Sequence, residues 1–212
     1  MREKRKEKRE KGRARCCGAS RGLTGLETLI WVGVFSVVLG TIVSATLYFY
    51  RVNRYTLGQA TSITSGQRGL DEMMRTIREA AYASDGAYPI ISIATSSFSF
   101  YADTDTGPQI EKLRYFLQGT TLYEGIVQAS GDPPVYTGAE ATSSVSENVR
   151  NITFATSTFR YFDSNGVLMT DYTQIDDVRF VTVNLIIDTD TTQLPPEITL
   201  RSSAGMRNLV GY

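Results

Sequence analysis

The sequence predicts an α+β protein in which one long N-terminal helix precedes an antiparallel β-sheet domain. Three observations predict this class. The stretch 23–50 is apolar and long enough to form a membrane-spanning helix. An amphipathic pattern continues the helix over 51–84. Segments rich in β-forming residues, separated by turn residues, then occupy 85–212, which is therefore the expected β-rich domain.

The first 22 residues form a basic leader. They hold ten Lys and Arg residues and three Glu residues, a net charge of +7, whereas the rest of the chain has a net charge of −7. A basic arm of this kind is found in nucleic-acid-binding proteins. Beside an apolar stretch it is more typical of a segment that the positive-inside rule keeps in the cytoplasm. Only Arg51 and Arg54 follow the stretch closely, so we expect a cytoplasmic N-terminus and an exported C-terminus.

The composition excludes several catalytic classes. The chain has no histidine, and its two cysteines, Cys16 and Cys17, are adjacent in the leader. Adjacent cysteines cannot link distant parts of a fold, and we interpret them as incidental thiols. Without histidine, Ser-His-Asp and Cys-His catalysis and most zinc sites are excluded.

The apolar stretch contains one charged residue. From Leu23 to Tyr50 that residue is Glu27, near the start. About 20 residues suffice for a helix to cross a bilayer. A secretory signal peptide would have a shorter apolar region followed by a small-residue cleavage site. Here the probable break, Gly22, precedes the apolar region, so the sequence predicts a span that the mature protein keeps.

In the continuation of the helix, mostly apolar residues recur at spacings of three and four and so form one stripe along the helix. Its members are Leu57, Ala60, Ile63, Gln67, Leu70, Met74, Ile77 and Ala81. Such a stripe predicts the face on which a globular domain docks. We expect the helix to stop near Ser84, before Gly86 and Pro89.

Strands are predicted from β-forming runs and turn signals. They are expected at 90–94, at 97–101, in 111–127 as two strands about a Gly-Thr turn, in 149–169 with an Asn165-Gly166 hairpin signal, at 178–188 and at 195–202. In the run 178–188, alternate residues fall on one face: Val181, Val183, Leu185 and Ile187. Residues 128–148 are expected to form a loop.

The segment Gly22-Leu23-Thr24-Gly25-Leu26-Glu27, behind a basic leader and ahead of a spanning helix, resembles the processing signal of type IV pilins and type II secretion pseudopilins. The resemblance implies a pilin-like fold and cleavage by a prepilin peptidase after Gly22. Leu23 would become the new, N-methylated N-terminus. The usual residues at positions 23 and 25 are Phe and an aliphatic residue; because Gly22 and Glu27 are kept, we expect processing.

The resemblance also implies a role for Glu27, which becomes the fifth residue of the mature chain. Its carboxylate would pair with the N-terminal amine of a neighbouring subunit and set the axial register of a fibre. The alternative is that Glu27 belongs to a helix start at the lipid boundary, where the helix dipole favours an acid.

Three segments of the body, 113–125, 152–166 and 198–209, resemble J-type minor pseudopilins and W-type minor pilins. This resemblance implies a non-catalytic subunit of the complex that initiates a pilus or pseudopilus. The implied partners are the prepilin peptidase, other pilins or pseudopilins, the inner-membrane assembly platform and lipid, with no nucleic acid for the mature chain. The implied location is the bacterial inner membrane, in a single pass, and then the extracytoplasmic fibre.

Two alternatives remain at this stage. A signal-anchored extracytoplasmic enzyme or binding protein would also have a spanning helix and a β-rich domain, and carboxylate-based catalysis needs no histidine.

No cofactor is expected. The runs 103–106 and 188–192 place carboxylates two residues apart, as calcium loops do, but solvated turns are the favoured interpretation.

Overall fold

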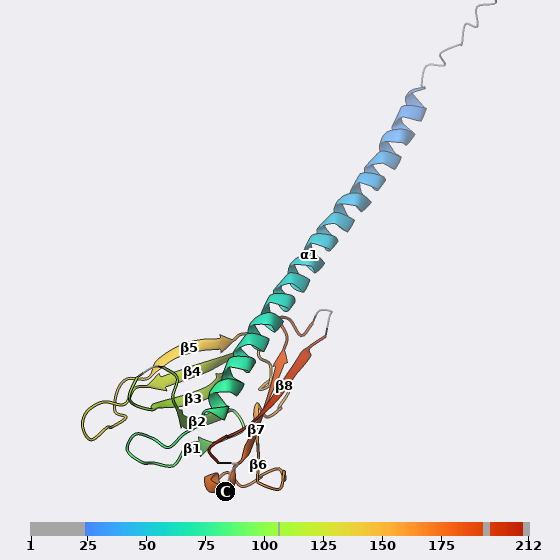
Figure 1. The fold of residues 1–212 in the computed structure, drawn as a ribbon. Helices are drawn as coiled ribbons and strands as arrows, with labels where there is room; N and C mark the ends of the chain where they lie inside the picture. The colour runs from blue at the N-terminus through green and yellow to red at the C-terminus, as the bar shows by residue number, and fades with distance from the viewer. Residues whose placement is uncertain (1–23, 106, 193–195, 210–212) are drawn as a thin grey trace, which may run out of the picture. The chain divides into compact units, whose positions relative to one another are not determined.

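The structure is a computed structural model that describes residues 24–105, 107–192 and 196–209. The chain divides into two compact units at Tyr50 and Arg51. Helix α1, Gly25–Arg78, contributes to both units, which confirms the long N-terminal helix (Figure 1). The helix ends six residues before the predicted stop at Ser84. Ala80 instead forms a bridge with Ala102, and the Ala81 N–H donates to the carbonyl of Tyr101 at 2.9 Å, so strand pairing replaces the last predicted turn.

The described strands of the second unit form two antiparallel sheets. The larger has the order β1-β2-β3-β4-β5. Its strands are β1 Ile90–Ile93, β2 Ser97–Ala102, β3 Glu111–Gln118, β4 Thr121–Val127 and β5 Ala141–Ser146. β3 and β4 are joined by the predicted Gly-Thr turn, in which Gly119 has a φ of +62°. The first four strands confirm the sequence prediction.

The smaller sheet has the order β6-β7-β8 among the described residues. Its strands are β6 Phe159–Phe162, β7 Phe180–Ile187 and β8 Ile198–Gly205, and a short 3-10 helix, Ile175–Asp177, precedes β7. The Asn165-Gly166 turn forms as predicted, because Leu168 bridges back to Phe162. The predicted alternation in β7 is confirmed, since all four of its predicted inward residues are fully buried: Val181, Val183, Leu185 and Ile187.

Two predictions about the chain between the sheets are wrong. β5 lies in the predicted loop 128–148; its sequence, ATSSVS, has no apolar alternation, and pairing with β4 makes it a strand. In the predicted strand at the start of 149–169, residues 151–155 form turns, and Val149 makes only an isolated bridge to Ile187. The buried Asn151 explains the turns, because its side chain donates to the Asn184 carbonyl at 2.7 Å and accepts the Ile186 N–H at 2.8 Å. These bonds satisfy the part of β7 that β6 is too short to reach.

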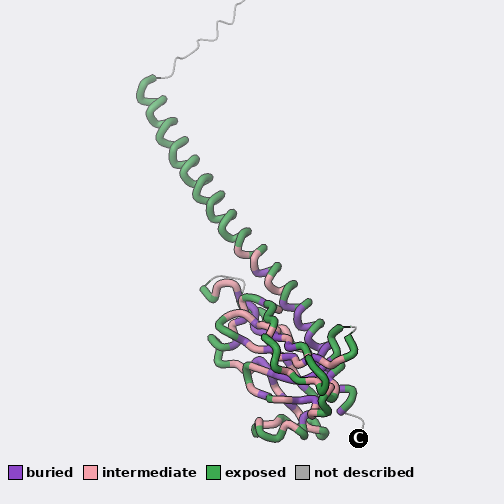
Figure 2. Tube along the Cα trace, turned by 90° about the vertical axis from the view of Figure 1, so that its left-hand side faces the viewer, coloured by how far each residue is buried: buried purple, intermediate pink, exposed green. Residues whose placement is uncertain are grey.

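One core lies beneath helix α1. Aromatic side chains from both sheets meet in it, and the ring centroids of Phe98 lie 4.7 Å from Phe100 and 5.6 Å from Tyr161. Met73 and Ile77 of the helix are fully buried in the same cluster. Figure 2 shows this concentration of buried residues in the second unit. Each of these side chains contributes about 1.5–3 kcal/mol by leaving water.

The docking face of the helix is only partly as predicted. Leu70, Met74 and Ile77 are buried, but three members of the predicted stripe are exposed: Leu57, Ala60 and Gln67. Five residues absent from that stripe are buried: Gln59, Gly66, Gly69, Met73 and Thr76. A hydrophobicity pattern misses glycine, whose contribution is the close approach of backbones rather than apolar area.

Two glycines bring the helix backbone against both sheets. A Cβ atom at Gly66 would lie 3.1 Å from Ile187 of β7 and 3.2 Å from Leu200 of β8. A Cβ atom at Gly69 would lie 2.5 Å from Val145 Cγ1 and 2.8 Å from the Val145 carbonyl oxygen in β5. The helix therefore packs on β5 of one sheet and on β7 and β8 of the other.

This close approach predicts opposite effects for alanine at two glycines of the same helix. Gly69→Ala should lower the free energy of unfolding by about 1–3 kcal/mol, because the new methyl group overlaps the β5 backbone. Gly58→Ala should raise it by about 0.5–1 kcal/mol, because its Cβ meets only Thr189 Cγ2, at 4.0 Å, and alanine favours a helix. Thermal unfolding of the full chain in detergent micelles measures both, and equal effects would contradict the proposed contact.

Candidate functional site

The candidate functional site is the N-terminal part of α1, residues 24–50, which we call the apolar segment. Every residue in it is exposed, including Leu26 at 75%, Trp31 at 63% and Phe35 at 62%. A soluble monomer rarely exposes an apolar surface of this extent. Its helix is long and apolar enough to cross a membrane, with a mean hydropathy of 2.1 over 18 residues. The segment therefore requires lipid or other apolar helices around it.

The aliphatic hydroxyl groups of the apolar segment are compatible with lipid. Five of the six donate to a carbonyl one turn back in the helix, at 2.7–2.9 Å: Thr28, Ser36, Thr41, Ser44 and Thr46. The sixth, Thr24, accepts the Glu27 N–H at the helix start. A polar group satisfied within its own helix adds little to the cost of leaving water. These residues therefore need no partner outside the helix.

Aromatic residues near the ends of the segment match the two surfaces of a bilayer. Trp31 lies near its start, and Tyr48 and Tyr50 lie at its end. Trp and Tyr concentrate at the lipid–water interfaces. At about 1.5 Å per residue, Trp31 and Tyr48 are about 26 Å apart along the helix, close to the ~30 Å of a hydrocarbon core. Glu27 precedes Trp31 by about one helical turn, so in such a bilayer it would lie near the headgroups.

The helix start gives Glu27 a local role as well. The Glu27 N–H donates to Thr24 Oγ1 at 3.4 Å, and the Thr28 N–H donates to the Thr24 carbonyl at 3.1 Å. The order Thr-x-x-Glu is that of a capping box, and an acid in the first turn suits the helix dipole. The cap uses the backbone N–H of Glu27. In the described part of the chain, its carboxylate has no hydrogen-bond or ion-pair partner.

The structure places one of the three predicted site residues. Glu27 lies in the first turn of α1 and is exposed. Gly22 and Leu23, the predicted cleavage site and new N-terminus, lie outside the described residues, as does the rest of the basic leader.

The two Asp/Thr runs have different environments. In the run 188–192, Asp188 is 2% exposed, and its Oδ1 accepts the Tyr55 hydroxyl at 3.2 Å and the Asp190 N–H at 3.0 Å. Burial, together with the charge of Asp188, raises the pKa of Tyr55. This carboxylate therefore connects helix and loop. In the other run, Asp103 and Asp105 lie beside Glu111 of β3.

The sequence interpretation missed Glu111 and Gln59. The burial of Glu111 could have been predicted from the sequence, because alternate residues of a strand face the same side and Glu111 therefore faces the core with Leu113 and Tyr115. Gln59 is 2% exposed; its Nε2 donates to the Ile187 carbonyl at 3.1 Å and its Oε1 accepts the Thr189 N–H at 2.9 Å. A polar residue off the apolar stripe gives no sequence signal for such a contact.

The hydrogen bonds of Gln59 predict a difference between two glutamines of the same helix. Gln59→Leu should lower the free energy of unfolding by about 1–3 kcal/mol, because the Ile187 carbonyl and the Thr189 N–H lose their partner in a buried site. Gln67→Leu should change it by at most about 0.5 kcal/mol, because Gln67 is exposed. Chemical denaturation in detergent micelles measures both. The reverse order would favour the docking face predicted from sequence.

No protein-family model matches this chain, and a comparison with curated proteins finds no significant match.

Proposed function

We propose that the chain is a structural minor pilin or pseudopilin. A prepilin peptidase would remove residues 1–22, and the mature subunit would assemble through its N-terminal helix into a type IV pilus or a type II secretion pseudopilus. One observation carries the proposal. The first unit of the chain contains a fully exposed, predominantly apolar helical segment whose only charged residue, Glu27, lies in the first turn and has no side-chain partner within the described residues.

An assembly role accounts for the apolar segment in both of its environments. In the membrane, lipid covers its side chains. A subunit that leaves the membrane for a fibre needs another apolar cover, and the same segments of neighbouring subunits supply it. Helices with small residues pack closely in such an environment, and Gly25, Gly33 and Gly40 leave open space where a side chain would stand.

Glu27 gains a partner in the fibre. A charged carboxylate at the centre of a membrane helix costs about 2.5–3.5 kcal/mol, and less near the interface. The amine of a mature Leu23 from a neighbouring subunit would offset this cost by pairing with the carboxylate. A shift of one helical turn, about 5.4 Å, would separate the two charges. The pair would thus select one axial register.

Orientation and class follow from the rest of the sequence. The +7 leader favours a cytoplasmic N-terminus in the bacterial inner membrane, so the β-rich domain would be extracytoplasmic. Residues 113–125, 152–166 and 198–209 carry the resemblance to J-type and W-type minor subunits. The mature chain would have no cysteine, whereas major pilins usually end in a cysteine-bounded loop. These features support a place in the initiation or tip complex, on the inner-membrane assembly platform.

Processing provides the first test of the proposed function. When the chain is co-expressed with a prepilin peptidase, mass spectrometry should find a mature N-terminus at Leu23. Gly22→Glu should abolish cleavage, because a long charged side chain then occupies the scissile position. Gly18→Glu, four residues upstream in the same leader, should be cleaved normally. An intact leader in the wild-type protein would support a signal-anchored enzyme or binding protein instead.

Fibre incorporation provides the second test. Glu27→Gln should still insert into the membrane but should enter fibres at least tenfold less, because loss of one member of a buried charge pair costs about 2–5 kcal/mol and 1.4 kcal/mol is tenfold. Immunoblots of sheared fibres and of membranes, from cells with the native assembly machinery, measure both quantities. Thr28→Val, which removes only an intrahelical hydrogen bond, is the matched control. Incorporation of Glu27→Gln at the wild-type level would exclude the charge pair.

A further inference from the structure

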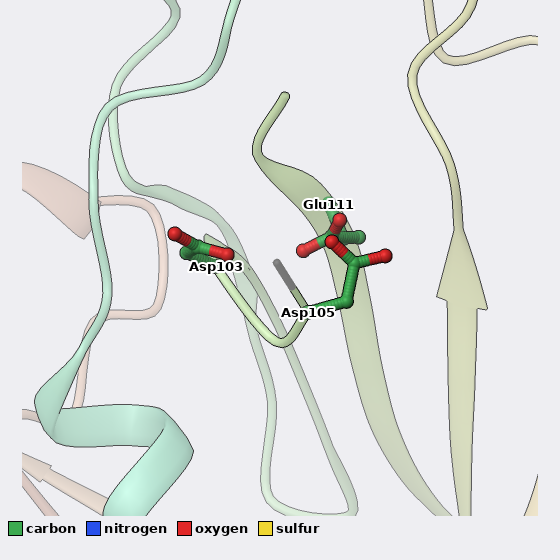
Figure 3. Close-up of side chains that lie close together, drawn as sticks. All are labelled: Asp103, Asp105 and Glu111. Atoms are coloured by element: carbon green, nitrogen blue, oxygen red, sulfur yellow. The ribbon is translucent and has the colours of Figure 1, made fainter. Parts of the chain in front are cut away.

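Three carboxylates gather where β2 passes into β3. Asp103 and Asp105 are exposed in the loop, and Glu111 is the first residue of β3. One oxygen atom from each lies within 4.8 Å of the others, and Figure 3 shows the three groups side by side. The strand register explains the grouping: Ala102 pairs with Glu111, so the loop leaves and returns at directly opposed residues.

Glu111 is the unusual member of this group, which we call the β2–β3 carboxylate cluster. Its side chain is 1% exposed. Oε2 accepts the N–H and the hydroxyl of Thr104 at 2.9 and 3.2 Å. Oε1 is buried and has no hydrogen-bond partner. A buried carboxylate oxygen without a partner is costly, so its position beside two further carboxylates points to a bound cation.

The neighbouring arginine does not neutralise the cluster. Arg75 of α1 and Glu79, the residue that follows the helix, line an open cleft together with Asp103, Thr104 and Asp105. Among the described residues, however, the only ion pair within 4.0 Å joins Arg114 to Glu140, on the other side of β3. Three carboxylates thus lie close together without a cationic side chain in contact, an arrangement that their mutual repulsion opposes.

We propose that the β2–β3 carboxylate cluster binds one calcium ion. Calcium takes oxygen ligands at about 2.3–2.6 Å, so ligands on opposite sides of the ion are about 5 Å apart, and three oxygen atoms that lie within 4.8 Å of one another can all reach one such ion. Magnesium requires about 2.0–2.1 Å and a near-ideal octahedron, which a loop with two exposed carboxylates does not enforce. A site made only of carboxylate oxygens does not select zinc, which favours nitrogen and sulfur ligands.

The ion would connect the loop after β2 to the first residue of β3 and give Glu111 Oε1 its partner. Asp105 Oδ1 also accepts the N–H of Gly107, which fixes the Asp105 side chain in the loop. The site lies within the second unit and depends neither on processing at Gly22 nor on the charge of Glu27. It is therefore independent of the proposed function.

The test uses the full chain in non-ionic detergent micelles, stripped of metal with a chelator. Isothermal titration with calcium chloride should show one site with a dissociation constant of about 10⁻⁴–10⁻³ M, the range of exposed extracellular sites. At a tenfold excess over that constant, the melting temperature should rise by about 3 °C. Magnesium chloride should bind at least tenfold more weakly.

Three variants connect the binding to the cluster. Asp103→Asn and Glu111→Gln should each weaken calcium binding at least tenfold and remove the rise in melting temperature. Glu147→Gln, which removes an exposed carboxylate after β5, should bind as the wild type does. Asp103 is exposed, so its variant gives a result even where Glu111→Gln does not fold. Absence of calcium binding and of any melting shift at about 10 mM calcium, or unchanged binding in Asp103→Asn, would overturn the proposal.

Discussion

The close contact of α1 with both sheets is the constraint on which the second unit depends. At Gly66 and Gly69 the helix backbone lies close to β5, β7 and β8. A larger side chain at Gly69 would overlap the backbone of β5, and one at Gly66 would crowd the Ile187 and Leu200 side chains. This approach brings Gln59 to the end of β7 and places Met73 and Ile77 on the aromatic core. Neither sheet is covered by another helix in the described residues, so the same contact also buries the apolar faces that the two sheets would otherwise expose.

Before Tyr50 the same helix has no sheet to pack on, and all of its described residues there are exposed. There its apolar residues have no core to join, and its aliphatic hydroxyl groups are satisfied within the helix. A segment that has met all its polar requirements internally can move between lipid and a bundle of similar helices at little cost. Glu27 is the exception, since its carboxylate has no such internal partner within the described residues. The contrast between one charged group and an otherwise self-sufficient segment is what supports an assembly role.

Sequence reasoning succeeded where one periodic signal determines the structure and failed where a tertiary contact does. The alternation in β7 and the Asn165-Gly166 turn are local signals, and both elements form as predicted. β5 has a polar sequence and becomes a strand only because its backbone pairs with the edge of β4. The β-forming residues at 149–156 do not form the predicted strand, because the buried hydrogen bonds of Asn151 to β7 require a turn. For the candidate site, the sequence singles out Glu27, whose role stays a prediction, but it does not single out Glu111, whose burial depends on the fold.

Glu27 and Glu111 illustrate one physical rule in two settings. A carboxylate oxygen in an apolar or buried place must have a partner, and one that finds none among the described residues directs attention to something outside the chain. For Glu27 the surroundings are apolar and helical, so a single cation at a fixed axial position, the amine of a neighbour, is the partner that we propose. For Glu111 two further carboxylates stand beside it, and one monovalent amine would leave them in repulsion. A divalent ion offsets two of the three negative charges, which is why the same rule leads to a proposed subunit contact at one glutamate and to a proposed metal site at the other.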